Sequence, residues 1–387
     1  MSSLGRPPSV QTLGAGVVRR ATRLADGREL IYFDDADTSL GEERSIDTRT
    51  LDARPATAMM RRDVLTGDWI SIAASRQNRA FLPPAHLDPL APQTPTNPSE
   101  IPSTYDVAVF ENKSPSFGPG LAAASGEVEA ARDAPLGLDD LDAPGLERSR
   151  SAIGRCEVVC FSPSHTGSFG TQTPRRARTV IEAWADRTAA LSALPGVQQV
   201  FPFENRGEEI GVTLHHPHGQ IYAYPYITPH TKLLLAAIER EGDDLFARIV
   251  AAEGSGPRVV LDSEHWIAYV PFAARWPIEV HLTPRRHVPD LAATSAPERD
   301  ELADVYLRLL RGLDALYETP TPYIAAWHQS PAHVGRDTVR LHLALTSPRR
   351  AADKLKYLAG SEAAMGAWIG DIPPETSAAR LREAIAS

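Results

Sequence analysis

Three histidines within four residues are the most informative chemical feature of this 387-residue chain: His215, His216 and His218. They follow an apolar segment and precede Gly219 and Gln220. In an extended segment, alternate side chains project to one face, so residues 216, 218 and 220 would place two imidazoles and an amide on one patch. That patch suits a phosphate group. A neutral imidazole is a good nucleophile toward phosphorus and, once protonated, a good leaving group.

Two other interpretations of this segment remain open: a surface histidine-rich loop, or half of a structural zinc site. In the phosphate interpretation, Gly219 lets the backbone approach the ligand, and Gln220 offers an amide N–H to a non-bridging oxygen. His215 points the opposite way and is structural. The pattern predicts a histidine that carries a phosphoryl or nucleotidyl group between two substrates.

The elements that would position this segment are those of an α+β protein. Apolar periodicity predicts helices over residues 179–194, 231–253 and 297–317, where Ser295 can cap the third. A hairpin signal covers residues 29–33. Strands are predicted at residues 106–110, 157–162, 210–214, 221–226, 259–261, 266–270, 278–282 and 339–345.

A weak internal repeat indicates duplication. The segments 157–165 and 278–287 both read as a strand, then Ser/Thr-Pro, then a histidine, about 120 residues apart. We therefore expect a duplicated histidine-triad-like unit, giving two antiparallel sheets with helices packed on them. The expected divisions are a partly extended, loosely attached leader (1–58), a first unit (59–230) with a flexible insertion (121–151), and a second unit (231–387).

Composition excludes several classes of partner. The formal net charge of −9 argues against binding to a phosphate backbone, and no apolar run reaches the roughly 18 residues of a membrane helix. Two cysteines cannot form a disulfide framework, and the first residues lack a signal or transit pattern. We expect a cytoplasmic protein that contacts neither nucleic acid nor membrane.

The motifs together resemble one family, galactose-1-phosphate uridylyltransferase, the transferase branch of the histidine-triad superfamily. His216-Pro-His-Gly-Gln220 is the specific motif, since hydrolytic and phosphorylase relatives usually have histidine where Gln220 stands. The other matching segments are 65–70 with Arg76 and Arg79, 106–112, 160–165, 203–205 with Gly211, 326–328 and 354–362.

The resemblance implies a ping-pong mechanism of galactose catabolism, the Leloir pathway. His218 would attack the α-phosphorus of UDP-glucose and release glucose 1-phosphate, and the uridylyl-histidine would then react with galactose 1-phosphate. Gln220 would stabilise charge on the transferred group. The implied substrate-binding residues are Arg76, Arg79 and Asn112 for the UDP moiety, Asn205, Gly211 and Thr213 for the phosphates, and Lys356 and Glu362 for the sugar phosphate and hexose, the last across a homodimer interface. Without the motif, each of these residues also fits an ordinary role, such as a solvated arginine, a turn cap or a surface ion pair.

The resemblance also implies bound metal ions, but several of the family's metal ligands are missing from this sequence. Zinc would be held by His165, His216 and Asp88 or His86, because the family's Cys-x-x-Cys pair is missing here. A second metal site looks dismantled: His328 and His342 match two ligands, but Ala344 replaces the third, and residues 231–235 contain no acid. We expect no second metal, and we expect Cys156 and Cys160 to be apolar packing residues.

Two alternatives to the uridylyltransferase remain. One is a related nucleotidyl enzyme, such as an ADP-sugar or dinucleotide phosphorylase, that uses the same His218. The other is a catalytically idle nucleotide-sugar-binding protein, against which the intact His218 and Gln220 count.

Overall fold

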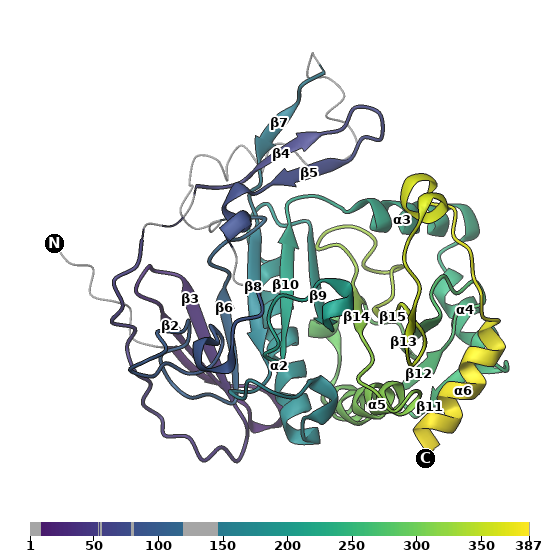
Figure 1. The fold of residues 1–387 in the computed structure, drawn as a ribbon. Coiled ribbons are helices and arrows are strands. Elements are labelled where there is room, and N and C mark those ends of the chain that lie inside the picture. Colours follow the sequence, from purple (N-terminus) through teal and green to yellow (C-terminus); the bar gives the residue numbers. More distant parts are fainter. Residues whose placement is uncertain (1–8, 53, 55, 79–80, 119–145, 387) are drawn as a thin grey trace.

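One antiparallel sheet dominates the computed structural model (Figure 1), which describes residues 9–118, except 53, 55, 79 and 80, and residues 146–386. Within these residues the sheet has twelve strands. In spatial order they are β1 (Ser9–Thr12), β2 (Val18–Arg23), β3 (Glu29–Asp34), β6 (Val107–Glu111), β8 (Arg155–Cys160), β10 (His218–Tyr224), β9 (Gln199–Arg206), β14 (Tyr323–His328), β15 (His342–Ser347), β13 (Ile278–Pro284), β12 (Trp266–Tyr269) and β11 (Val259–Asp262).

The sheet consists of two halves with the same topology. The first half, in chain order, is β3, β6, β8, helix α2 (Pro174–Ser192), β9 and β10; the second half is β11, β12, β13, helix α5 (Ala296–Ala315), β14 and β15. Their innermost strands, β9 and β14, pair antiparallel, with Glu204 opposite Ala325. The two predicted antiparallel sheets are therefore present as two halves of one continuous sheet, each with its long helix.

Helices α2 and α5 pack against each other and cover the same face of the sheet. Each begins with a capping residue followed by proline in the first turn: Thr173 accepts a hydrogen bond from Arg176 N, and Ser295 forms a capping box with Glu298. The hydrophobic core lies between these helices and the sheet. Because strand residues alternate, every second side chain faces the opposite, helix-free face.

Smaller elements surround this body. Helices α3 (Pro229–Glu241) and α4 (Leu245–Gly254) replace the single helix predicted over 231–253, because Gly242 adopts a positive φ of 106° and ends α3. Helix α6 (Pro374–Ala386) packs on α5 and β11. Strands β4 (Met59–Arg62), β5 (Trp69–Ile72) and β7 (Ser149–Ser151) form a small sheet that projects from the body, and β16 (Arg349–Ala351) pairs with β17 (Lys354–Leu355).

Several predictions differ from the structure. The leader is not loosely attached: β3 is paired on both sides and its residues Leu30–Asp34 are buried, since Leu30, Ile31 and Phe33 complete the core. Residues 210–214 form no strand; a short 3₁₀ turn, Glu208–Ile210, ends there at Gly211 with φ of 84°. Most of the predicted insertion 121–151 lies outside the described residues, and its last residues form β7. Among the described helices, none has the length and apolar character needed to cross a membrane.

Candidate active site

His218 and Gln220 lie at the start of β10 and share one face. In this strand Gly219 and Ile221 are buried toward the helices, whereas His218, Gln220 and Tyr222 are partly exposed on the helix-free face. The Nδ1 atom of His218 lies 2.7 Å from the carbonyl oxygen of His216. Since a carbonyl only accepts, Nδ1 carries the hydrogen and the lone pair sits on Nε2. The ring is thereby held in the tautomer that a nucleophile at Nε2 requires.

Gln220 has a buried amide oxygen that, among the described residues, accepts no hydrogen bond. Buried polar atoms normally have a partner, so this oxygen can accept a hydrogen bond from a bound ligand. Packing gives a reason for Gly219 that the sequence did not indicate. A Cβ at this position would lie 2.9 Å from Phe161 Cζ and from the carbonyl oxygen of Phe203, so packing within the sheet requires glycine here.

His216 does not share the face of His218. It precedes the strand, is 1% exposed, and directs its Nδ1 to Asp88 Oδ2 at 2.6 Å. The predicted patch of two imidazoles therefore contains only one. The sequence suggested otherwise because it predicts a strand over residues 210–214 that leads into the histidines, whereas the observed strand begins at His218. His215 is a surface residue with Nε2 3.4 Å from Glu208 Oε1, not a structural one.

Asp88, His165 and His216 form a cluster whose ligand atoms all lie within 4.8 Å of one another. Asp88 Oδ2 also lies 2.8 Å from His165 Nδ1. Burial alone would raise the pKa of Asp88, but hydrogen bonds from His216, Leu90 N and His165 and the charge of His216 lower it to about 2. This carboxylate is therefore ionised at neutral pH and joins the two imidazoles.

The cluster fits a zinc ion in ligand type and, after a small expansion, in size. Ligand atoms about 2.0–2.2 Å from a tetrahedral ion are about 3.3 Å apart, slightly more than the distances observed here. Asp88 rather than His86 is the third member. The cysteines are not ligands: both are buried, and burial raises the pKa of Cys156 to about 12 and that of Cys160 still further. Thiols in this state pack as apolar groups.

Of the residues predicted to bind substrate in the first half, most lie on loops beside the sheet. Arg76 donates to the carbonyl of Ser114 at 3.3 Å, and Asn112 Oδ1 accepts from Ser114 N at 2.9 Å, so both hold the loop after β6. Asn205 lies on β9 and projects to the helix-free face. Gly211 and Thr213 lie in the segment between β9 and β10, and Arg79 lies outside the described residues.

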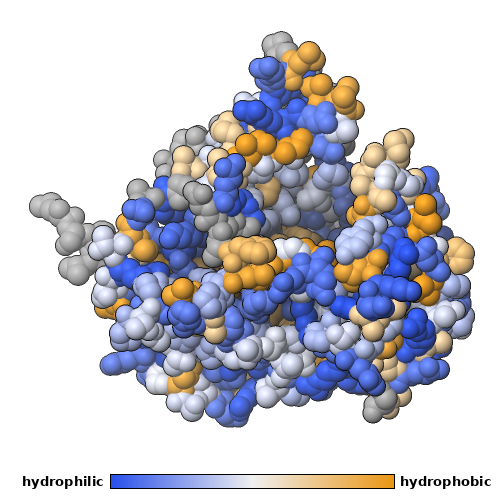
Figure 2. Space-filling model, viewed as in Figure 1, coloured by the Kyte–Doolittle hydropathy of each residue, from blue (hydrophilic) through white to orange (hydrophobic). Residues whose placement is uncertain are grey.

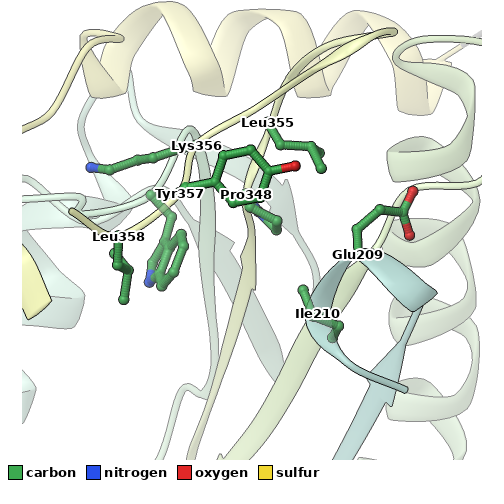
Figure 3. A pocket seen from close by; sticks show the side chains of 8 residues that line it. Glu209, Ile210, Pro348, Leu355, Lys356, Tyr357 and Leu358 are labelled. Atoms are coloured by element: carbon green, nitrogen blue, oxygen red, sulfur yellow. The ribbon is translucent and has the colours of Figure 1, made fainter. Parts of the chain in front are cut away.

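Lys356 and Glu362 form an ion pair in the second half, with Lys356 Nζ 3.5 Å from Glu362 Oε1. Lys356 is 4% exposed, and its Nζ also donates to the backbone carbonyls of Arg275 and Ile369. The pKa of the Glu362 carboxyl is lowered, chiefly by a hydrogen bond from its own backbone N–H. Figure 3 shows the Lys356 ammonium pointing away from Glu209 across a pocket of about 160 Å³.

Sequence reasoning missed the groups that hold His216. Its Nε2 lies 2.7 Å from the Ser162 carbonyl oxygen and 3.0 Å from Tyr105 Oη. It also missed strand β9, which pairs with β10 and brings Phe203 opposite Gln220. Alternation of Gln199, Phe201, Phe203 and Asn205 was the available signal, and Pro202 within it obscured the strand.

An imidazole in the tautomer that leaves Nε2 as the nucleophilic atom, beside an amide on one strand face, is typical of enzymes that transfer a group through histidine. Comparison with known proteins narrows this class. Residues 52–228 match the family described as galactose-1-phosphate uridyl transferase, N-terminal domain, and residues 235–386 match its C-terminal domain. The chain belongs to the galactose-1-phosphate uridyl transferase family, and it is therefore a transferase.

Individual relatives agree with this assignment. Galactose-1-phosphate uridylyltransferase of Streptomyces lividans is 42% identical over 386 residues, which cover 94% of this chain and 97% of the relative. The Thermotoga maritima protein of the same name is 32% identical over 84% of this chain and 98% of its own length. A solved structure titled as a uridylyltransferase has a TM-score of 0.72 and 29% identity, covering 85% of this chain and 98% of that chain.

Proposed function

We propose that this enzyme transfers a uridylyl group from UDP-glucose to galactose 1-phosphate, in galactose catabolism in the cytoplasm. The observation that carries the proposal is the position of His218, whose ring is fixed by the His216 carbonyl and shares a strand face with Gln220. The family membership supplies the substrate class.

The mechanism follows from these groups. The Nε2 lone pair of His218 attacks the α-phosphorus of UDP-glucose, and the bond from that phosphorus to the bridging oxygen breaks to release glucose 1-phosphate. The phosphate oxygen of galactose 1-phosphate then attacks the uridylyl-histidine, forming UDP-galactose and returning His218 to its first state. Gln220 donates its amide N–H to the transferred group, where negative charge develops.

Binding of the two substrates is assigned by position. Arg76, Arg79 and Asn112 hold the UDP moiety, while Asn205, Gly211 and Thr213 line the phosphates. Lys356 and Glu362 contact the sugar phosphate and hexose. Because these last two lie on the second half, away from β10, they would serve the site of a partner subunit in a homodimer.

Exposed apolar side chains support the homodimer. They gather at two separate places, the projecting hairpin and the C-terminal loop (Figure 2). The residues are Met59, Val64, Leu65, Ile70 and Ile72 on the hairpin, and Tyr357, Leu358, Met365, Trp368 and Ile369 on the loop. Leu65 is 92% exposed. Groups of exposed apolar side chains are typical of protein interfaces. Leu65→Asp should shift the mass measured by sedimentation toward the monomer, whereas Ile46→Asp, at an exposed position elsewhere, should not.

Zinc at the Asp88, His165 and His216 cluster is part of the proposal. Bound there, zinc would fix the turn before β10 from which the His216 carbonyl orients His218. Metal analysis of the purified protein, compared with Asp88→Ala, tests this: one zinc per chain lost in the variant supports it, and equal zinc content contradicts it.

The decisive experiment is intact-protein mass spectrometry after mixing the enzyme with UDP-glucose alone. We expect a gain of one uridylyl group that is absent in His218→Gly and is discharged by galactose 1-phosphate. An adduct with ADP-glucose instead would indicate a related nucleotidyl enzyme. Bound UDP-glucose without any adduct would indicate an idle binding protein.

A further inference from the structure

A second pocket, of about 330 Å³, lies in the outer part of the second half, where α4 packs beside β11 and β12 (Figure 1). One wall is the small apolar side chains of α4: Ala247, Val250 and Ala251. The other wall carries charge, from Asp262 at the end of β11, Arg285 directly after β13 and Arg340 two residues before β15. The pocket is therefore apolar on one side and charged on the other.

Arg340 is a buried positive charge without a negative partner. It is 6% exposed, and its Nη1 donates to the backbone carbonyls of Pro284 at 3.3 Å and Arg285 at 3.1 Å. Within the described part of the chain, Arg340 forms no ion pair, and its buried Nε has no hydrogen-bond partner. Side chains this deeply buried normally pair their charge with an opposite one. Arg340 can therefore accept an anion from outside the chain.

The neighbouring ionisable groups do not neutralise Arg340. Burial lowers the pKa of Arg340, and the one listed interaction that opposes this is with Tyr269. Burial, together with the charge of Glu253, raises the pKa of Tyr269, so this phenol is neutral at physiological pH. The Glu253 carboxylate is paired elsewhere, with Arg258 Nε at 2.9 Å from its Oε2. Arginine itself stays protonated at this pH.

The charges that line the pocket suit a ligand with one negative charge. Arg285 forms an ion pair with Asp262, so the positive charge of Arg340 is left over. The C-terminal end of α4, at Gly254 and Ser255, adds a partial negative charge to the same pocket. A doubly charged phosphate monoester is therefore disfavoured, and a carboxylate matches the single charge.

We propose that this pocket binds a small organic monocarboxylate, whose carboxylate pairs with Arg340 while its aliphatic tail lies along Ala247, Val250 and Ala251. Arginine binds carboxylates through adjacent N–H donors, and Nε and Nη2 donate to none of the described residues. Because Nε is buried, Nη2 is the first donor that the ligand meets. Strands β9, β14, β15, β13 and β12 lie between β11 and the strand of His218, so the proposal is independent of the uridylyl transfer.

The test is isothermal titration of the full chain with the sodium salts of acetate, butyrate and hexanoate, at an ionic strength held constant with sodium chloride. We expect one site per chain whose affinity rises about two- to threefold for each added CH₂, because the tail is removed from water on α4. Arg340→Met should raise the Kd for hexanoate about tenfold or more, since the donors to the carboxylate are lost.

Two tryptophan variants on α4 test the apolar wall. Ala251→Trp fills the pocket from an exposed position and should also raise the Kd about tenfold or more. Ala252→Trp, at an exposed neighbour that does not line the pocket, should bind hexanoate as the wild type does. Thermal unfolding checks that each variant is folded, and if Arg340→Met does not fold, Ala251→Trp decides.

Three results would overturn the proposal. The first is that no carboxylate of the series binds, and the second is an equal Kd for hexanoate in the wild type and the deciding variant. The third is that inorganic phosphate binds more tightly than hexanoate and is lost in Arg340→Met, because the site would then select a phosphate.

Discussion

The start of β10 in the first half and the start of β15 in the second occupy equivalent places in the sheet, but they carry different chemistry. His218 pairs across to Cys160, two residues before Ser162-Pro163, whereas Ala344 pairs across to His281, two residues before Thr283-Pro284. The counterpart of the nucleophile is therefore an alanine, and the histidine lies on the neighbouring strand. One backbone arrangement thus supports the proposed nucleophile in one half and a group of imidazoles, those of His281, His328 and His342, in the other.

The second position of the comparison is Gln220, whose counterpart by register is Thr346. Gln220 pairs with Val158, and Thr346 pairs with Glu279. The threonine side chain is shorter than that of glutamine, and it lies on the same face of β15 as His342. The strand face is shared by the two halves, and the side chains on it decide the function of each.

The largest expected effect is at the nucleophile. His218→Gly should lower the rate of uridylyl transfer roughly 10³-fold or more, since no covalent intermediate can form. Ala344→Ser, at the equivalent position of the second half, should leave the rate unchanged. Steady-state assays of both variants test whether the halves differ in function as proposed; a similar loss in both would contradict it.

Gln220 should have the next largest effect. Gln220→Ala removes one donor to the charge that develops on the transferred group, and we expect kcat to fall roughly 10²-fold with the adduct still detectable. Thr346→Val is the matched control. A fall in kcat of Gln220→Ala no greater than that of Thr346→Val would remove Gln220 from the mechanism.

The free energy of unfolding should depend on pH through Glu204, which lies at the junction between the two halves. This residue is 4% exposed on β9 and accepts a hydrogen bond from Tyr323 Oη at 2.9 Å, and burial raises its pKa to about 7. A raised carboxyl pKa stabilises the fold below about pH 4.5, and this stabilisation is lost as the pH rises through 7. Between about pH 4.5 and 7, the wild type should lose at most about 3 kcal/mol of unfolding free energy through this group. Glu204→Gln should not show that loss. Urea unfolding at several pH values measures it, and parallel curves for the two proteins would count against this role.

Asp88 should make the free energy of unfolding depend on pH in the opposite direction to Glu204, and its substitution should have a slightly smaller effect. Its pKa is lowered to about 2, so its stabilisation is present above the unfolded value near pH 4 and lost as the pH falls through 2. At pH 7, Asp88→Asn should cost about 2 kcal/mol of unfolding free energy, because two hydrogen bonds to a charged acceptor weaken. Unfolding in the presence of a chelator separates this effect from metal binding. An unchanged midpoint would show that the carboxylate does not hold the cluster.

The sequence was sufficient to predict the duplicated α+β fold. The Ser/Thr-Pro repeat located β8 and β13, and the apolar periodicity located α2 and α5 with errors of a few residues. It could not show that β9 pairs with β14, because strand pairing over more than 100 residues leaves no local pattern. It could not place His281 opposite Ala344 either, since that contact depends on register. The sequence places His216 and His218 on one face only if one extended strand runs through Pro217. The alternation of apolar and polar residues does not show that the strand begins after this proline.

The antiparallel pairing of β9 with β14 has a consequence for the origin of the molecule. A lone half would expose the hydrogen-bonding edge of its innermost strand, and such edges associate with a second copy. Two copies joined that way would have carried identical side chains at equivalent positions. Once both copies were encoded in a single chain, each could change without the other. The asymmetry between a histidine at 218 and an alanine at 344 is a change of the kind that such a fusion permits.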